Sequence, residues 1–149
     1  MSTLKVGDMA PSLSGVDQNN NEVSLARFAG KKLVLYFYPK DDTPGCTTES
    51  CNLRDNYKAL LAQGYQVLGV SPDTVAKHQK FIAKYDLPFD LLADTEKEVC
   101  NRYGVWVEKS MYGRTYMGVA RTTFILDEEG RVEEIISKVN TKDHAAQIL

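Results

Sequence analysis

The sequence predicts an α/β fold with a central mixed β-sheet, flanked by helices and preceded by an N-terminal β-hairpin. Two observations support this prediction. Apolar runs alternate with helical patterns through the first two thirds of the chain, and two strands joined by a tight turn follow them. Strands that alternate with helices pair in parallel, whereas a hairpin contributes antiparallel strands. The 149 residues fit one domain, residues 1–149, with a sizeable core.

The composition is that of an ordinary globular protein, with 43% hydrophobic and 26% charged residues. No apolar run approaches the roughly 20 residues of a transmembrane helix, and no signal peptide is visible. Three cysteines are too few for a disulfide scaffold, so we expect a cytoplasmic protein. The net charge is −2 without a basic stripe, and we therefore expect neither nucleic acid nor a membrane surface as a partner.

The first elements follow from the pattern of apolar residues. Alternating residues on either side of the polar segment 17–21 predict a small hairpin within residues 13–25, with an Asn-rich turn. The run Leu33–Tyr38 is apolar throughout, which is typical of a strand covered on both faces. Pro39 ends that strand, and a polar loop follows as far as Gly45.

The middle of the chain alternates between helical and extended patterns. Apolar residues recur near helical spacing from Cys46 until Gly64 stops the helix. The sequence then predicts a buried strand, a helix and a short strand, at residues 67–70, 72–85 and 89–93. A short helix through Val99 and Tyr103 follows them.

The last third of the chain predicts a closing hairpin. The aromatic segment Trp106–Tyr116 is expected to be an ordinary loop that packs on the sheet. Two strands at residues 122–126 and 132–136 are joined by the turn at residues 127–130, and residues 143–149 form a final helix. A βαβ unit followed by a ββα unit is the thioredoxin-like arrangement.

Ligand sites of open α/β sheets lie beyond the carboxyl ends of strands. The loop after Tyr38 is such a place, and Cys46 begins the helix that follows it. The first turn of a helix presents unpaired N–H groups and a positive dipole end, both of which favour the nucleophilic thiolate. Thr43 adds a hydroxyl that could bind a small polar substrate. We therefore interpret Cys46 as a reactive thiol, the alternative being a small buried side chain.

Cys51 lies five residues after Cys46. In an ideal helix the two Cα atoms would be roughly 8.6 Å apart, beyond the roughly 7 Å that a disulfide tolerates. Either the two cysteines never pair, or pairing requires the first turns of the helix to unwind. The spacing is not Cys-x-x-Cys, so the usual motif of dithiol reductases is absent.

Other candidate residues have an ordinary interpretation beside a functional one. Arg121, just before a predicted strand, could be a surface residue or a fixed guanidinium that favours the Cys46 thiolate and holds a polar oxygen. Glu49 could orient this arginine through a bidentate pair, or could merely complement the helix dipole. Cys100 lies among apolar residues, and we expect a structural role for it.

No cofactor is predicted. His78 and His144 lie far apart in the sequence, without carboxylate or cysteine partners at the spacing of metal ligands, so no metal site is expected. No Gly-x-Gly-x-x-Gly motif or phosphate-binding loop indicates a nucleotide.

The segment from Tyr38 to Cys51 resembles the active-site segment of peroxiredoxins, and in particular that of the bacterioferritin-comigratory or peroxiredoxin Q branch. The signature Pro-x-x-x-Thr-x-x-Cys and the second cysteine of this branch fall on Pro39, Thr43, Cys46 and Cys51. Residues 119–127 resemble the stretch that carries the family's active-site arginine, here Arg121. The resemblance covers nearly the whole chain.

The resemblance implies a thiol peroxidase with a thioredoxin fold, which reduces hydrogen peroxide and organic hydroperoxides. Cys46 would become a sulfenic acid, and Cys51 would resolve it as an intramolecular disulfide. Thioredoxin or a similar dithiol would reduce that disulfide. Thr43, Arg121 and the backbone N–H of Cys46 would hold the peroxide, and Pro39 would shield the sulfenic acid. The branch is commonly monomeric, and no metal or flavin would be needed.

Two other functions are compatible with the same residues. A thiol–disulfide oxidoreductase that acts on proteins would share the fold, but it would require the Cys-x-x-Cys motif. A peroxide sensor would use oxidation of Cys46 and Cys51 to expose a surface for a partner. The threonine and the arginine serve a peroxide better than a partner, so the peroxidase is the favoured function.

Overall fold

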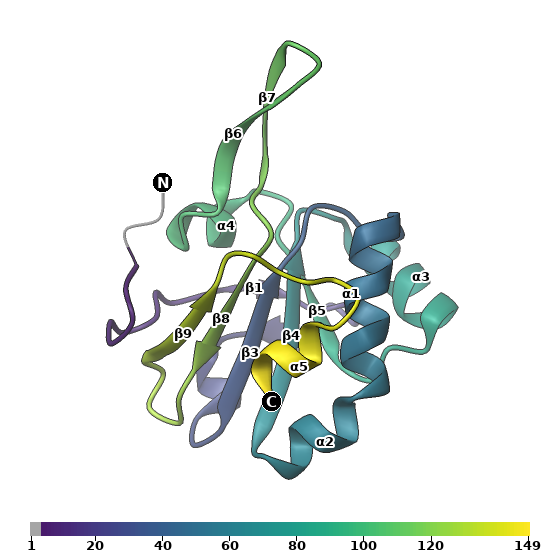
Figure 1. The fold of residues 1–149 in the computed structure, drawn as a ribbon. Helices are drawn as coiled ribbons and strands as arrows, with labels where there is room; N and C mark the ends of the chain where they lie inside the picture. Colours follow the sequence, from purple (N-terminus) through teal and green to yellow (C-terminus); the bar gives the residue numbers. More distant parts are fainter. Residues whose placement is uncertain (1–3) are drawn as a thin grey trace.

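The computed structural model describes residues 4–149 (Figure 1). Its helical elements are the 3-10 helix η1 (Leu25–Phe28) and the helices α1 (Pro44–Asp55), α2 (Tyr57–Ala62), α3 (Val75–Tyr85), α4 (Glu98–Arg102) and α5 (His144–Ile148). Its strands are β1 (Gly15–Val16), β2 (Glu22–Val23), β3 (Lys32–Phe37), β4 (Tyr65–Ser71), β5 (Asp90–Ala93), β6 (Trp106–Met111), β7 (Arg114–Val119), β8 (Thr122–Leu126) and β9 (Val132–Ile136).

Seven strands form one mixed sheet in the order β2-β1-β5-β4-β3-β8-β9. The central strands β3, β4 and β5 are parallel, β1 and β8 join them antiparallel, and β9 pairs antiparallel with β8. The parallel centre and the antiparallel closing hairpin are as the sequence predicts. Phe37 at the carboxyl end of β3 pairs with Thr122 at the start of β8. Arg121 therefore lies at the same edge of the sheet as the loop that leads to Cys46.

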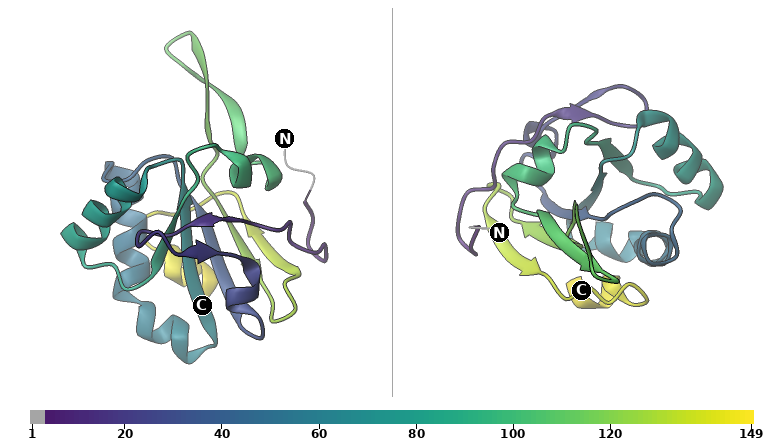
Figure 2. Two further views of the ribbon diagram at one scale, coloured as in Figure 1. Left: turned by 180° about the vertical axis from the view of Figure 1, so that it is seen from behind. Right: turned by 90° about the horizontal axis from the view of Figure 1, so that it is seen from above.

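The main sheet has a hydrophobic core on each face. Successive residues of β3 point to opposite faces of the sheet and are buried in different clusters. Leu33, Leu35 and Phe37 belong to a core cluster that includes α4 and the N-terminal hairpin. Val34, Tyr36 and Tyr38 belong to a second cluster, formed with apolar residues of α1, α2, α3 and α5. Figures 1 and 2 show α1 and α5 together on this second face.

The long predicted helix is interrupted in the structure. It begins two residues before Cys46, because Pro44 occupies the first helical position, where proline is favoured. It ends at Asp55, because the next residue, Asn56, has a φ of −109° and a ψ of 13°, and α2 begins at Tyr57. The Asn56 side-chain amide donates to the carbonyl of Asn52 at 2.9 Å, and such local side-chain bonds compete with a regular helix.

The prediction of a loop over Trp106–Tyr116 is wrong. These residues belong to the antiparallel hairpin of β6 and β7, which forms its own two-stranded sheet. It projects from the body of the molecule in Figure 1. Tyr112 and Gly113 at its tip both have positive φ, as a tight hairpin turn requires. A tyrosine with positive φ is sterically unfavourable, and tyrosine is uncommon in such turns. The sequence therefore gives little indication of a turn at this position.

Among residues 4–149, no helix is long and apolar enough to cross a membrane.

Candidate active site

Cys46 lies in the first turn of α1, with Thr43 as the N-cap residue. Its side chain is almost fully buried, with 1% of its surface exposed. N–H groups in the first turn of a helix have no intrahelical acceptor, and they point toward the space before the helix. The sulfur therefore lies beside donors that favour a negatively charged ligand or transition state.

Arg121 binds both Cys46 and Glu49. Its Nη2 donates to Cys46 Sγ at 3.3 Å, and its Nη1 donates to Glu49 Oε1 at 2.6 Å. The expected bidentate pair with Glu49 is therefore wrong, because the two nitrogens of the fork hold different partners. A hydrogen bond from a guanidinium is stronger to a thiolate than to a thiol, so the arrangement favours the anionic sulfur.

Gly45 makes room for this guanidinium. A Cβ atom at this position would lie 3.2 Å from Arg121 Nη2 and 3.9 Å from its Cζ. The group that approaches the backbone at Gly45 is thus the guanidinium of Arg121. The absence of a side chain therefore sets how near the positive charge comes to Cys46.

Thr43 lies half-buried at the mouth of the site, and Pro39 lies half-buried in the loop between β3 and α1. The Thr43 hydroxyl donates to the carbonyl of Lys40 at 2.8 Å. Because its single hydrogen is used in this bond, Oγ1 can act only as an acceptor toward a further ligand. A ligand that presents an O–H group to Thr43 and an oxygen lone pair to Arg121 fits this pattern.

Glu49 is completely buried. Burial raises the pKa of this carboxyl to about 7, although Arg121 opposes the rise. Its second oxygen, Oε2, accepts no hydrogen bond. Within residues 4–149, every other buried side-chain nitrogen or oxygen has a hydrogen-bond partner. Instead it lies 3.6 Å from His144 Nε2 at the start of α5.

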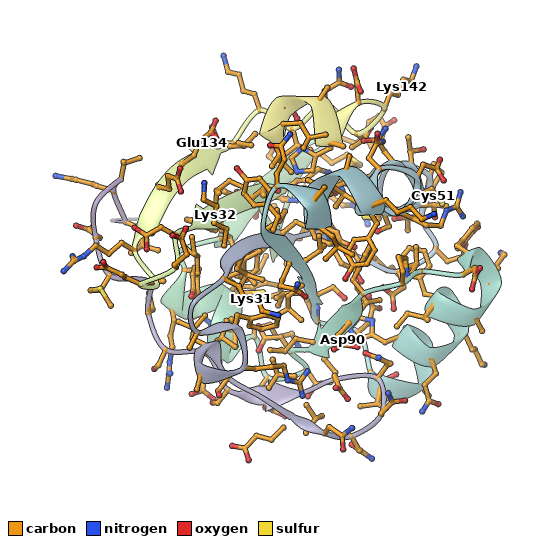
Figure 3. The ribbon with its side chains drawn as sticks, turned by 90° about the horizontal axis from the view of Figure 1, so that it is seen from below. Lys31, Lys32, Cys51, Asp90, Glu134 and Lys142 are labelled. Carbon is orange, nitrogen blue, oxygen red and sulfur yellow. The ribbon has the colours of Figure 1, made fainter. Side chains whose placement is uncertain are left out.

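Cys51 is half-buried, on the part of α1 that faces the rim of the molecule in Figure 3. Burial raises its pKa, while the charge of Arg54 opposes this. Neither Cys46 nor Cys51 is in a disulfide. Both lie within one continuous helix, so the spacing argument applies and a bond between them requires α1 to open.

Cys100 is fully buried on α4. Its backbone N–H donates to Asp94 Oδ2 at 2.8 Å. Burial and the nearby carboxylate of Asp94 raise the pKa of the thiol well above its usual range. This environment opposes thiolate formation, and it is consistent with the structural role expected for this cysteine.

Both histidines have carboxylate neighbours that the sequence spacing does not indicate. His78 Nδ1 lies 2.6 Å from Asp41 Oδ2, and Tyr38 donates to the other oxygen of Asp41 at 2.5 Å. The backbone N–H of Asp41 donates to Asp73 at 2.7 Å. These contacts hold the loop between β3 and α1 against α3. Packing thus brings carboxylates to both histidines from positions distant in the sequence, which the spacing of residues along the chain does not reveal.

Glu49→Gln should change how stability depends on pH. Because folding raises the pKa of Glu49, the folded state binds its proton more tightly than the unfolded state does. The resulting contribution to the free energy of unfolding is complete below pH 4.5, the ordinary pKa, and is lost as the pH rises to about 7. The wild type should thus lose up to about 3 kcal/mol relative to the variant over this window. Urea unfolding of both proteins at several pH values measures this. A difference that stays constant with pH would contradict the assignment.

Comparison with known proteins places this site in a family. Residues 6–135 match the AhpC/TSA family. The chain is 46% identical over 147 residues to the putative peroxiredoxin bcp of Coxiella burnetii, and the match covers 99% of this chain and 97% of the relative. It is 44% identical over 147 residues to peroxiredoxin Bcp of Bacillus subtilis, with 99% and 94% covered.

Solved structures agree with these relatives. Peroxiredoxin Q of Xanthomonas campestris is 36% identical and superposes with a TM-score of 0.88, covering 99% of this chain and 93% of that chain. A cysteine-to-serine mutant of PrxQ from Xylella fastidiosa is 31% identical with a TM-score of 0.92, covering 99% and 94%. The bacterioferritin comigratory protein of Xanthomonas campestris, 35% identical, is described with alkyl peroxide reduction activity.

The thioredoxin-like fold and the resemblance to peroxiredoxins are thereby confirmed over nearly the whole length of the chain. The chain belongs to the AhpC/TSA family, and within it this protein is a thiol peroxidase of the Bcp, or peroxiredoxin Q, group.

Proposed function

We propose that Cys46 is the thiol that attacks the peroxide, that Cys51 resolves the product, and that thioredoxin or a similar dithiol completes the cycle. The observation that carries this proposal is the 3.3 Å hydrogen bond from Arg121 Nη2 to Cys46 Sγ at the N-terminus of α1. Cys51 and Cys100 lie elsewhere and have raised pKa values, so neither has a comparable environment.

In the first step, the Cys46 thiolate attacks the terminal oxygen of the hydroperoxide. An S–O bond forms, the O–O bond breaks, and the leaving alkoxide or hydroxide takes up a proton from the medium. Thr43 Oγ1 accepts the hydrogen bond of the peroxide O–H group, while Arg121 and the N–H of Cys46 stabilise the developing negative charge. Pro39, half-buried in the same loop, shields the sulfenic acid from further oxidation.

In the second step, the Cys51 thiolate attacks the sulfenic sulfur, an S–S bond forms as the S–O bond breaks, and the leaving hydroxide takes up a proton from the medium to become water. This step requires the first turns of α1 to open. Opening disrupts the bond from Arg121 to Glu49 and the 2.9 Å bond between the hydroxyls of Ser50 and Tyr36. Both thiols are then restored by exchange with the external dithiol.

The remaining parts of the proposal concern the whole protein. The main sheet uses strands from Gly15 to Ile136, which supports one domain over residues 1–149. A cycle between thiols and a disulfide needs a supply of reduced dithiol, which supports a cytoplasmic location. We propose that the protein acts as a monomer, because every residue assigned to the cycle comes from the same chain.

Cys46→Ser should abolish peroxide turnover because a serine hydroxyl is not ionised at neutral pH and cannot replace the thiolate. Consumption of hydrogen peroxide, with thioredoxin and its reductase present, measures turnover. Circular dichroism should show an unchanged fold. Turnover at the wild-type rate would refute the assignment of Cys46.

Cys51→Ser should leave the first oxidation of Cys46 intact but reduce steady turnover by at least about tenfold, since no second thiol resolves the sulfenic acid. A stopped-flow burst followed by steady-state turnover separates the two steps. Cys100→Ser is the matched control and should behave like the wild type. If Cys100→Ser shows the defect and Cys51→Ser does not, the resolving role belongs to Cys100.

Gly45→Ala should lower the rate of the first oxidation by about tenfold, because a few tenths of an ångström of displacement moves Arg121 away from the sulfur. The stopped-flow burst is again the measurement. Gly15→Ala is a suitable control, since its Cβ would lie 3.1 Å from Leu92 Cδ2, a similarly close contact that involves neither Arg121 nor Cys46. Equal effects of the two substitutions would argue against a specific role for Gly45.

A further inference from the structure

The C-terminal helix α5 places a buried histidine behind the active site. His144, the first residue of α5, is completely buried, and its Nε2 lies 3.6 Å from Glu49 Oε2. That oxygen accepts no hydrogen bond, although it is buried. A buried carboxylate oxygen without a donor is costly when it is charged, so the site is more stable with one proton on Glu49 or His144 than with none.

The surroundings of His144 determine which ring nitrogen carries a hydrogen. Nδ1 lies 2.8 Å from Gln147 Oε1. The orientation of the Gln147 amide is defined, because its Nε2 donates to the carbonyl of Lys138 and its Oε1 accepts from the N–H of Asn140. Gln147 Oε1 is therefore an acceptor, and Nδ1 of His144 must donate to it.

The other nitrogen faces two oxygens. Nε2 lies 2.7 Å from the hydroxyl of Thr123 on β8 and 3.6 Å from Glu49 Oε2. With Nδ1 protonated, a neutral His144 ring has its lone pair on Nε2, which accepts from the Thr123 hydroxyl at 2.7 Å while the protonated Glu49 oxygen lies 3.6 Å away. A charged ring instead directs its Nε2–H toward Thr123 and the ionised Glu49. In both states one proton belongs to the Glu49–His144 pair.

We propose that His144 is a positioning residue of the peroxidase reaction, which shares one proton with Glu49 and so lets Glu49 orient Arg121 without cancelling its positive charge. The inference rests on Cys46 being the thiol that attacks the peroxide.

The charges around the pair explain why one proton matters. The groups that face it are Arg121 before β8, Cys46 on the same helix as Glu49, the buried Tyr36 on β3, and the neutral side chains of Thr123 and Gln147. With one shared proton the Glu49–His144 pair is neutral, and the full charge of Arg121 acts on Cys46. Without that proton, Glu49 neutralises Arg121 in a site with little water.

The opposite pKa shifts of the two partners agree with this geometry. Burial raises the pKa of Glu49 to about 7. Burial also lowers the pKa of His144, as does the charge of Arg121, while the bond to Gln147 opposes this. The two shifts reverse the ordinary order of the two proton affinities, so the proton of the pair lies mainly on Glu49 when the ring of His144 is neutral.

A double-mutant cycle tests the proposal. We expect His144→Gln to slow the stopped-flow oxidation of Cys46 at pH 7 by about tenfold in the wild-type background. In a Glu49→Gln background the same substitution should change the rate by less than about twofold, because its partner is already removed. Equal losses in the two backgrounds would overturn the proposal, since His144 would then act independently of Glu49.

A control variant separates the effect of the shared proton on Cys46 oxidation from the effect of weaker packing of α5. Ile148→Ala weakens the packing of α5 and keeps His144. It should lower the melting temperature while leaving the pH profile of Cys46 oxidation unchanged. If Ile148→Ala reproduces the loss seen in His144→Gln, including its dependence on Glu49, the docking of α5 accounts for the effect and the proposal fails.

Nuclear magnetic resonance of the wild type gives a test that needs neither a stable variant nor peroxide. The chain has two histidines, so ¹⁵N-histidine labelling gives two sets of ring signals. Nδ1 of His144 should carry a hydrogen at neutral pH, and its Nε2 shift should move together with the ¹³C shift of the Glu49 carboxyl near pH 7. Independent titrations would refute the shared proton, even if Cys46 proves to be the peroxidatic thiol.

Discussion

The position of one guanidinium governs the site. Arg121 can reach Cys46 because Phe37 pairs with Thr122, which places the end of β3 and the start of β8 at the same edge of the sheet. Gly45 leaves the space that this approach requires, and Glu49 holds the second nitrogen. The contact between Arg121 and Glu49 therefore ties the position of this positive charge to the first turns of α1, which carry both Cys46 and Glu49.

The loop before Cys46 is held from the other side of the site. The Asp41 carboxylate contacts His78 on α3 and the hydroxyl of Tyr38, the residue that follows β3. Its backbone N–H donates to Asp73. The loop is thus fixed at Asp41 while Thr43, two residues later, remains half-exposed at the entrance. A rigid support beneath an accessible hydroxyl suits a small substrate that must meet several donors and acceptors at once.

Local patterns in the sequence predict most of the sheet and the reactive position. An apolar strand, a polar loop and a helix that begins near Cys46 are each visible within a few residues, and the family signature adds Arg121. The partnership of Glu49 with His144 cannot be found in this way, because it depends on α5 packing against α1, 95 residues away. The β6–β7 hairpin is missed for a different reason, since Tyr112 adopts a turn conformation that is unusual for tyrosine.

Asn52 follows Cys51 and binds the C-terminal segment with both ends of its amide, donating to the carbonyl of Lys142 at 3.1 Å and accepting from the N–H of Ala145 at 2.8 Å. In the proposed cycle, opening of α1 as far as Cys51 strains or breaks this grip. The lifetime of the sulfenic acid before Cys51 attacks it therefore depends on the contact between Asn52 and residues 142–145. A longer wait gives a second peroxide molecule more opportunity to convert the sulfur irreversibly to the sulfinic acid. In that cycle, the contacts of Asn52 with residues 142–145 influence how much of the sulfenic acid is recycled and how much is lost to overoxidation.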